Sequence, residues 1–514
     1  MPTRNAAKTS AKLTATTTRS PGWIPILGIF CAYVAALLFG REQVPAGLNN
    51  DVAAEALRGL YLVEGKHFEV ITFSIGNSAE TLYLYVLGAM AQLLGPTTLA
   101  IQLTSWLVAL ACIWLIWKLV ERITDTIPPW IPVLTAACSL WLFHYARSGL
   151  RAICSPFFLA AFTLLLDRAE RRPNDRAAGL LCGAVLGLSI YGYTSNRALA
   201  IAFVGYAAFR LIRQWKTEVR LARLYSTIAL GALVVSIPNL LFFLRQPRDF
   251  LFRGSYVLRG GMSDWAVNTM WTVLFPFYYP DVYRHIGGPG FFFDGVSAGL
   301  TSSGFSPVPL VFAAAFLVGL WQAGQYIDKP VTAFLVAAWA AAILSLGVAG
   351  PSLTRLLIIL PVYLVLAALG FGYLIRKRPV LRIPLLLLIL YVGVGDGYSY
   401  LSGQGEALDY YAAAGTSIGE AANRLAASGQ KIVCVVSRDA GVVSYLTHRQ
   451  LVRVKTVEFY QRMPNPAEIP LDEFRPDTLL VEDAPAFQSL IAQLPKEWPT
   501  AKGDRYYVAS LSRR

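Results

Sequence analysis

The sequence predicts a polytopic α-helical membrane protein with about eleven membrane-spanning helices and a small soluble α/β domain at its C-terminal end. Hydrophobic residues make up 55% of the 514 residues and charged residues only 15%. Globular proteins are about one quarter charged, so a soluble chain of this composition would lack a polar surface. The apolar residues also gather in long stretches, and Lys and Arg gather in alternate connections between them.

Each apolar stretch is about 17 to 25 residues long, as the hydrocarbon core of a bilayer requires. Several stretches are short or interrupted by Gly and Pro, which leaves ten to about thirteen spans open. The segments that we expect to span the membrane are 23–40, 97–117, 129–145, 153–167, 177–194, 198–213, 225–244, 307–324, 331–349, 356–375 and 383–399.

Positive residues in alternate connections predict the orientation in the membrane. Basic residues cluster before the first segment, around Lys118, at 168–176, at 210–223, at Lys329 and at 376–382. We therefore expect an inner or plasma membrane protein whose N-terminus is cytoplasmic. An odd number of spans places the C-terminal domain on the extracytoplasmic side.

Three regions follow from this pattern. Residues 1–22 are polar and are expected to be a disordered cytoplasmic N-terminus. Residues 23–399 form the transmembrane domain, whose long outer loops are 41–96 and 246–306. Residues 400–514 form the soluble domain, because short β-branched runs alternate there with helical patterns.

The first outer loop contains two expected surface helices. Asn49, Asn50 and Asp51 are candidate N-caps of the first, and Ser78 is the candidate cap of the second, with Glu80 in its first turn. In the soluble domain we expect helices at 409–428 and 484–494, and strands at 431–437, 451–457, 478–483 and 506–512.

Composition excludes several classes of function. The net charge of +14 belongs to short clusters beside apolar spans, so nucleic acid is not an expected partner, whereas membrane lipids are. Five of the six cysteines lie in apolar spans, and no zinc or disulfide pattern is present. The soluble domain lacks GxGxxG and a Gly-Lys-Ser phosphate loop, so we expect no nucleotide site there.

Acidic residues in the first outer loop are the leading candidates for chemistry. Asp51 lies at the membrane surface with Glu55 one helical turn later, and Glu80 lies in an otherwise apolar segment. Helix capping and favourable placement in the helix dipole are the ordinary alternatives for Asp51 and Glu80. A carboxylate among apolar residues at the membrane boundary is costly without a partner or a task, so Asp51 and Glu80 are expected to converge on one outward cavity.

Several segments carry a resemblance to a known superfold: GNSAETLYLYVLGAMAQLLG, HYARSGLRAICSPFFLAAFTLLLDRAERR, GLSIYGYTSNRALAI, RHIGGPGFFFD and GPSLTRLLIILP. Their order and their positions relative to the spans resemble the GT-C superfold of membrane glycosyltransferases. The nearer likeness is to the family-39 group, which includes protein mannosyltransferases and the lipid A aminoarabinose transferase. The likeness runs from about residue 45 to 365 and does not extend to the C-terminal domain.

The resemblance implies an inverting glycosyltransferase of the cell envelope. A hexose or pentose would pass from a polyprenyl-phosphate carrier to a lipid, glycan or protein acceptor hydroxyl at the extracytoplasmic face. Asp51 falls on the general base of the family, and Glu80 falls on a second acidic residue that orients substrate or, with Asp51, holds Mg²⁺ or Mn²⁺. Two departures from the commoner pattern weaken the expectation of a metal: Glu80 is followed by Thr-Leu instead of Lys and Pro, and Asp51 has no acidic neighbour directly after it.

A leaving phosphate requires cationic partners, for which guanidinium groups are well suited. Interfacial anchoring is the ordinary alternative for each basic residue. The expected substrate- or phosphate-binding residues, with the acidic residues that support them, are Glu55, His67, Glu80, Arg147, Arg151, Arg284, His285 and Arg355.

A non-enzymatic transporter or flippase of lipid-linked glycans is the alternative function. Such a protein places charged residues near the bilayer midplane in broken helices. Here the acidic candidates lie in outer loops and the spans are almost free of charge, which favours the enzyme.

Overall fold

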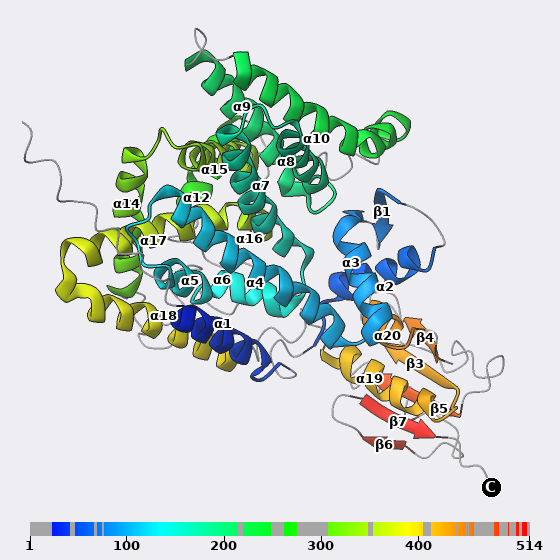
Figure 1. Ribbon diagram of the computed structural model, residues 1–514. Helices are drawn as coiled ribbons and strands as arrows, with labels where there is room; N and C mark the ends of the chain where they lie inside the picture. The colour runs from blue at the N-terminus through cyan, green and yellow to red at the C-terminus, as the bar shows by residue number, and fades with distance from the viewer. Residues whose placement is uncertain are drawn as a thin grey trace, which may run out of the picture.

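The computed structural model consists of a body of packed helices with a small sheet domain beside one end of it (Figure 1). The structure describes residues 23–41, 47–65, 69–74, 77–213, 219–247, 262–274, 307–347, 353–403, 413–436, 440–448, 450, 452–456, 477–482, 492, 500–502 and 506–510.

Every predicted span is helical. Ten of them correspond to one helix each: α1 (Trp23–Leu38), α4 (Thr98–Ile123), α7 (Cys154–Arg171), α8 (Arg176–Ser189), α9 (Arg197–Arg213), α10 (Val219–Arg245), α14 (Pro307–Gln325), α15 (Pro330–Gly347), α17 (Leu360–Lys377) and α18 (Arg382–Gly403). Within the described residues, four helical stretches are long and apolar enough to cross a membrane by length and composition: Thr98–Ile123, Arg151–Arg171, Val219–Arg245 and Thr354–Lys377.

The third predicted span, 129–145, is interrupted. It consists of α5 (Trp130–Ala137) and α6 (Leu140–Ser148). Ser139 adopts an extended backbone and its hydroxyl accepts a hydrogen bond from the Leu142 amide at 3.3 Å. A serine in this position caps a new helix, so it ends α5 and starts α6 within one apolar segment.

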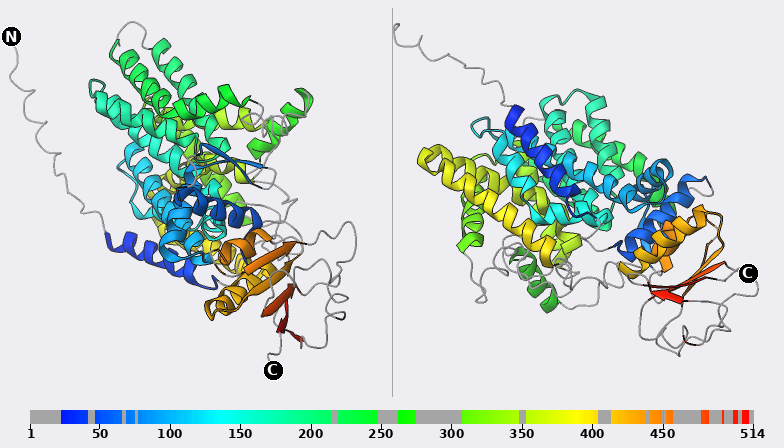
Figure 2. Two further views of the ribbon diagram at one scale, coloured as in Figure 1. Left: turned by 90° about the vertical axis from the view of Figure 1, so that its right-hand side faces the viewer. Right: turned by 90° about the horizontal axis from the view of Figure 1, so that it is seen from below.

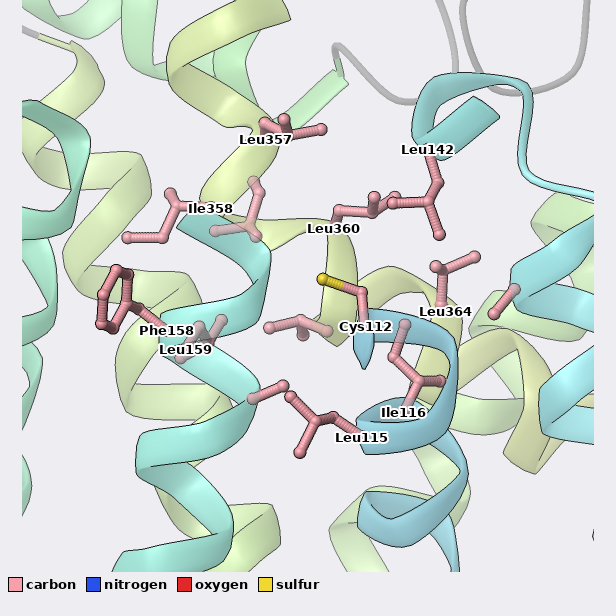
Figure 3. Packing of buried hydrophobic residues seen from close by; sticks show 14 of the residues in the cluster. Cys112, Leu115, Ile116, Leu142, Phe158, Leu159, Leu357, Ile358, Leu360 and Leu364 are labelled. Atoms are coloured by element: carbon pink, nitrogen blue, oxygen red, sulfur yellow. The ribbon is translucent and has the colours of Figure 1, made fainter. Parts of the chain in front are cut away.

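The apolar core lies between α4, α6, α7 and α17 (Figure 3). Cys112, Leu142, Leu159 and Leu364 come from these four helices and are at most 1% exposed. Between neighbouring helices of a membrane protein, small residues allow close backbone approach. At the crossing of α14 and α17, a Cβ on Gly319 would lie 1.8 Å from the Leu366 carbonyl oxygen, so only glycine fits.

The predicted basic connections, as far as the structure describes them, lie at one end of the helical body. Arg213, the last residue of α9, pairs with Asp328 in the turn after α14 at 2.9 Å. Lys329 donates to the carbonyl oxygen of Ile123 at the end of α4 at 2.6 Å. These contacts confirm that the basic turns share one end, whereas the side of the membrane that this end occupies stays a prediction.

At the opposite end, the first loop forms a helix–hairpin–helix unit, which we call the outer module. It consists of α2 (Asn50–Val63), the antiparallel strands β1 (Ile71–Ser74) and β2 (Asn77–Glu80), and α3 (Leu82–Leu94). The prediction that Ser78 caps the second helix is wrong, because Ser78 pairs with Phe73 in the hairpin. Glu80 consequently ends a strand, in register with Ile71, and does not lie in the first helical turn as predicted.

The helices of the outer module cross at two glycines. A Cβ on Gly59 of α2 would lie 2.2 Å from the Leu84 carbonyl oxygen, and one on Gly88 of α3 would lie 2.1 Å from the Gly59 carbonyl oxygen. The two helices therefore touch through their backbones. This contact fixes the position of α2, which carries two of the acidic candidates.

The soluble domain has a five-stranded sheet in the order β4-β3-β5-β7-β6. The bounds are β3 (Ile432–Val436), β4 (Val452–Thr456), β5 (Thr478–Glu482), β6 (Thr500–Lys502) and β7 (Tyr506–Ser510). β3 is parallel to β4 and β5, while β7 is antiparallel to β5 and β6. The four predicted strands are present, and β6 was not predicted. The predicted helix at 484–494 falls outside the described residues except for Ala492.

Two helices of this domain are described, α19 (Ala413–Ala427) and α20 (Ala440–Leu446). α20 was not predicted, and it packs against α2 of the outer module (Figure 1). Its Tyr445 hydroxyl donates to the Thr97 carbonyl oxygen at 3.1 Å, and His448 lies 2.9 Å from a Glu64 carboxylate oxygen. Figure 2 shows the sheet domain beneath the outer module in both further views.

Within the second long loop, the structure describes one helix, α12 (Met262–Leu274). It packs on α15, where the Trp265 indole donates to the Leu344 carbonyl oxygen at 3.2 Å. Single helical turns complete the framework: η1 (Arg151–Ile153), η2 (Thr194–Asn196), α16 (Leu353–Leu356), η3 (Leu357–Ile359) and η4 (Pro379–Leu381).

Candidate active site

The start of α2 presents two carboxylates on one helical face. The Asn49 side chain accepts hydrogen bonds from the amides of Asp51 (2.9 Å) and Val52 (3.4 Å), which confirms the predicted helix start. Asp51 is exposed, and Glu55 follows one turn later, where side chains four residues apart are neighbours at about 6 Å. The cap thus fixes the direction in which Asp51 leaves the helix.

Arg151 joins Glu55 to Glu80. Its Nε lies 2.8 Å from Glu55 Oε1, and its Nη1 lies 3.0 Å from Glu80 Oε2. The three side chains are only 5% to 12% exposed. Buried charges are stable when they are paired and hydrogen-bonded, so the guanidinium explains how two carboxylates persist together in this place.

The second oxygen of Glu80 has partners from η2 and from the first residue of α9. The Thr194 hydroxyl donates to Glu80 Oε1 at 2.7 Å, and Arg197 Nη2 lies 3.7 Å from the same oxygen. The Leu82 amide donates to the Tyr191 carbonyl oxygen at 3.0 Å, which holds the two segments side by side. Two carboxylates and two guanidinium groups therefore form one charge-balanced cluster.

Tyr193 completes the wall of this cluster. Its ring lies under the Arg151 guanidinium, with 5.2 Å between the guanidinium carbon and the ring centroid. A buried cation over an aromatic face gains electrostatic stabilisation of about 2 kcal/mol. The ring thereby restricts Arg151 to the orientation in which it reaches both carboxylates.

Gly149, whose backbone is in the left-handed conformation, lies between Arg147 and Arg151 and directs them to different partners. Gly149 ends α6 with φ +77°, and a Cβ there would lie 2.3 Å from a methyl group of Ile101. The chain turns at this residue. Arg151 then faces the carboxylates while Arg147 remains on α6.

Arg147 contacts the end of α1. It is 1% exposed and donates to the carbonyl oxygens of Ala36 (3.0 Å), Leu37 (3.2 Å), Phe39 (2.8 Å) and Gly40 (2.7 Å). The last carbonyls of a helix lack intrahelical partners, so this guanidinium acts as a cap. These contacts do not favour the phosphate-binding role expected for Arg147, which stays a prediction.

The remaining predicted residues are only partly described. Arg355 lies on α16, which packs against η2, the turn that carries Thr194. This arrangement brings Arg355 to the same end of the helical body as the carboxylate cluster. His67, Arg284 and His285 lie outside the described residues.

Sequence reasoning placed Asp51, Glu55, Glu80 and Arg151 among the candidates but missed Thr194 and Tyr193. A usable signal was present in YGYTSNR, a polar and aromatic run at the end of an apolar segment. Polar residues at the end of an apolar segment have few roles other than lining a functional site or capping a helix. What the pattern lacked was any indication that this run faces Glu80.

The carboxylates described here do not fit a divalent cation well. Both oxygens of Glu80 and one of Glu55 already bind guanidinium or hydroxyl groups. Among the described residues, moreover, no group of three or more His, Cys, Asp or Glu side chains could hold a metal ion. Of the two expected metal ligands, Asp51 and Glu80, the second is therefore already bound through both oxygens, to Arg151 and Thr194.

The fold is that of a polytopic helical membrane protein with a cluster of carboxylates and guanidinium groups at one end of its helical body. A protein-family profile described as dolichyl-phosphate-mannose-protein mannosyltransferase matches residues 81–242. That segment begins directly after Glu80 and contains Arg151, Thr194 and Arg197. No curated protein matches the sequence.

Solved structures show the same fold over nearly the whole chain. ArnT from Cupriavidus metallidurans bound to undecaprenyl phosphate is 13% identical, with a TM-score of 0.55 over 96% of this chain and 98% of that one. Its apo state gives a TM-score of 0.56 at 12% identity, over 95% of this chain and 98% of that one. The oligosaccharyltransferase AglB from Archaeoglobus fulgidus, in complex with an inhibitory peptide and a dolichol-phosphate, is 12% identical, with a TM-score of 0.51 over 90% of this chain and 69% of that one.

These matches confirm the suspected resemblance to the GT-C superfold and the predicted class of fold, a polytopic α-helical membrane protein. They support glycosyl transfer as the general class of activity. At 11% to 13% identity the solved structures speak for the fold, and the chemistry has to be argued from the residues of this chain.

Proposed function

We propose that this chain is an inverting glycosyltransferase that moves a sugar from a polyprenyl-phosphate carrier to an acceptor hydroxyl. The reaction takes place at the membrane face that carries α2, which we take as extracytoplasmic. The observation that supports this most directly is the exposed Asp51 carboxylate, held one turn from Glu55 at the edge of the Arg151 cluster. The relatives whose structures contain undecaprenyl phosphate or a dolichol-phosphate support the class of donor.

Asp51 is the proposed general base. It takes the proton of the acceptor hydroxyl while that oxygen bonds to the anomeric carbon of the sugar. The bond from the anomeric carbon to the phosphate oxygen breaks on the opposite face, and the polyprenyl phosphate leaves with the electron pair. One displacement inverts the anomeric centre, so a second carboxylate is not needed as a nucleophile.

Glu55 and Glu80 have a positioning role in this proposal. Both are bound to Arg151 and are nearly buried, so neither is available as a base for an incoming hydroxyl. Their ion pairs join α2, the end of β2 and η1 into one unit. Because Asp51 is carried by α2, this unit sets the place at which the acceptor proton is removed.

Arg197 and Arg355 are the proposed partners of the leaving phosphate. The Arg197 side chain is 33% exposed and lies 3.7 Å from Glu80, at the edge of the carboxylate cluster. Arg355 lies on α16 beside η2. Guanidinium groups bind phosphate oxygens in a bidentate manner and stabilise the charge that develops on them. Arg284, His285 and His67 remain additional proposed contacts.

The proposal does not require a metal ion. Arg151 pairs with both carboxylates, and Arg197 and Arg355 are the positive charges proposed to face the phosphate. The acceptor class remains lipid, glycan or protein, since the described residues contain no feature that selects among them.

The test uses the full-length protein purified in detergent and a panel of polyprenyl-phosphate sugars. We expect the Asp51→Asn variant to lose at least about 100-fold in turnover, because a general base contributes about 10² to 10⁴. Asp328→Asn, an exposed carboxylate in a surface ion pair at the other end, should retain wild-type turnover.

Undiminished turnover in Asp51→Asn would remove the proposed base. If purified protein in vesicles moves a lipid-linked glycan across the bilayer without forming any transfer product, the transporter function is correct instead. Chelation of divalent cations should leave turnover unchanged, and a loss that Mg²⁺ or Mn²⁺ restores would contradict the metal-independent mechanism.

A further inference from the structure

A polar cavity of about 650 Å³ lies at the end of the helical body that carries the basic turns, away from the acidic cluster. It lies between the connection from α4 to α5 and the turn from α17 to α18. Charged, hydroxyl and aromatic side chains line it, including Glu121, Asp125, Thr126, Trp130, Arg376 and Arg382.

Two guanidinium groups are positioned within this cavity. Arg376 donates to the Thr126 hydroxyl at 3.0 Å, and the guanidinium carbon of Arg382 lies 5.9 Å from the centroid of the Trp130 ring. One carboxylate of the lining, Glu121, is neutralised by Lys118 at 2.8 Å. Asp125 is the other carboxylate of the lining, so the two negative charges of the lining equal the two positive charges of Arg376 and Arg382, and Lys118 beside the cavity brings the local sum to +1. The two guanidinium groups, with hydroxyl and aromatic neighbours, suit a phosphate group.

An apolar groove of about 380 Å³ adjoins this cavity. Pro25 lines both spaces, and α1, α5 and α18 contribute to both. Within the groove the helices expose small residues: Gly28, Ala32 and Ala36 from α1, and Gly393 and Gly397 from α18. From Pro25 to Ala36 the groove follows α1 for about 16 Å at 1.5 Å per residue.

We propose that the polar cavity and the apolar groove together form a binding site for one glycerophospholipid. Its phosphodiester lies between Arg376 and Arg382, and one acyl chain occupies the groove along α1. The pairing of a phosphate-binding cavity with a contiguous apolar groove between the same helices fits a lipid and not a free phosphate. Basic pockets between helices at a membrane surface are suited to lipid head groups.

The proposed lipid site is separate from the proposed active site. Asp51, Glu55 and Arg151 lie in the outer module and next to it, at the opposite end of the helical body. A lipid here packs α1 and α18 against α5, so its expected effect is on stability. Loss of the proposed glycosyltransferase activity in an Asp51 variant would leave lipid binding intact, and the two proposals can therefore fail independently.

The experiment measures phospholipid retained by the full-length protein after purification in mild detergent, by native mass spectrometry and by lipid extraction. We expect about one tightly bound phospholipid per chain. The double variant Arg376→Ala/Arg382→Ala should lose most of it. Lys377→Ala/Arg378→Ala removes the same charge from the same basic run but not from the cavity lining, and should retain it.

A second pair of variants tests the groove. A Cβ on Gly28 would meet nothing within 4 Å, so Gly28→Leu fills the groove without displacing backbone. We expect it to lose the bound lipid. Gly205→Leu on α9 is the matched control, because its surroundings are equally open and it does not line the groove. Melting temperatures show that each variant is folded.

Four results would overturn the proposal. Wild-type lipid retention in the arginine double variant or in Gly28→Leu would exclude the site. Equal loss in Lys377→Ala/Arg378→Ala would indicate general surface charge. Binding of inorganic phosphate by the wild-type protein with no phospholipid retained would indicate a soluble phosphate ligand. Recovery of a polyprenyl phosphate in place of a glycerophospholipid would make the groove part of the donor path.

Discussion

Arg151 Nη1 lies 3.0 Å from Glu80 Oε2, although the two residues are 71 positions apart in the chain. The same guanidinium reaches Glu55 at 2.8 Å through Nε. One buried cation therefore connects three segments of the chain. Substituting Arg151 leaves two buried carboxylates whose charges are neither paired nor solvated by water.

We predict that Arg151→Met lowers the unfolding free energy by about 3–5 kcal/mol, since removing one partner of a buried ion pair leaves an uncompensated charge. The melting temperature in detergent measures this loss. Adding Glu55→Gln and Glu80→Gln to Arg151→Met should recover part of the stability, because the two unpaired carboxylate charges are then removed. A melting temperature of the single variant equal to wild type would show that the cluster is not structural.

The second stability prediction concerns the cap that Arg147 forms at the end of α1. Its four hydrogen bonds to carbonyl oxygens at the end of α1 have no replacement in an apolar environment. Arg147→Ala should therefore lose at least about 3 kcal/mol, and Arg147→Lys should lose less because the ammonium still donates. Arg213→Ala, whose side chain is 53% exposed, serves as the control and should change little.

The same variants distinguish the two roles considered for Arg147. If this residue bound the donor phosphate, Arg147→Lys would raise the KM for the donor with little change in melting temperature. The capping role predicts the reverse, a lower melting temperature with an unchanged KM for donor in the protein that remains folded.

The contact between α20 and α2 predicts that the soluble domain supports the site. Burial raises the pKa of the Tyr445 phenol, which keeps it protonated and able to donate to the Thr97 carbonyl oxygen. A second contact joins the domain to the start of α2. The amide of Leu48, which is three residues before Asp51, donates to the Thr416 hydroxyl at 3.0 Å. We therefore expect the domain to hold the start of α2 in place.

For Tyr445→Phe combined with His448→Ala, we predict a severalfold lower kcat at an unchanged KM for the donor, since Asp51 is carried by α2. Limited proteolysis should also release the C-terminal domain faster. Tyr506→Phe on β7, in the same domain but away from α2, is the matched control. Faster proteolysis with unchanged kcat would restrict the contact to a structural role.

The presence and order of the helices along the chain could be predicted because they depend on local composition. Apolar stretches of bilayer length indicate spans wherever they occur, and ten of the eleven predicted spans correspond to one helix each. The position of Asn49 before an amphipathic stretch likewise predicted the start of α2. Such signals lie within a few residues of the feature that they specify.

The sequence was insufficient where distant contacts decide local structure or the partners of a residue. Residues 77–80 form a strand because they pair with 71–74 across a hairpin, and Ser78 was therefore mistaken for a helix cap. Arg147 and Arg151 are similar basic residues in sequence, but Gly149 turns the chain between them and gives them different partners. α20 is only seven residues long, and its packing on α2 gives it a stability that its own sequence does not indicate.

By itself the sequence determined the membrane class of the protein, the helices that build it, the alternate placement of its basic turns and the acidic residues Asp51, Glu55 and Glu80 as candidates for chemistry. These features follow from hydrophobicity, charge and spacing along the chain. Only the tertiary structure decided that Glu55 and Glu80 meet at Arg151, that Thr194 and Arg197 join them, and that Arg147 caps α1. The physical reason is that the pairing of buried charges depends on distances between segments that lie far apart in sequence, and the residue types alone do not encode those distances.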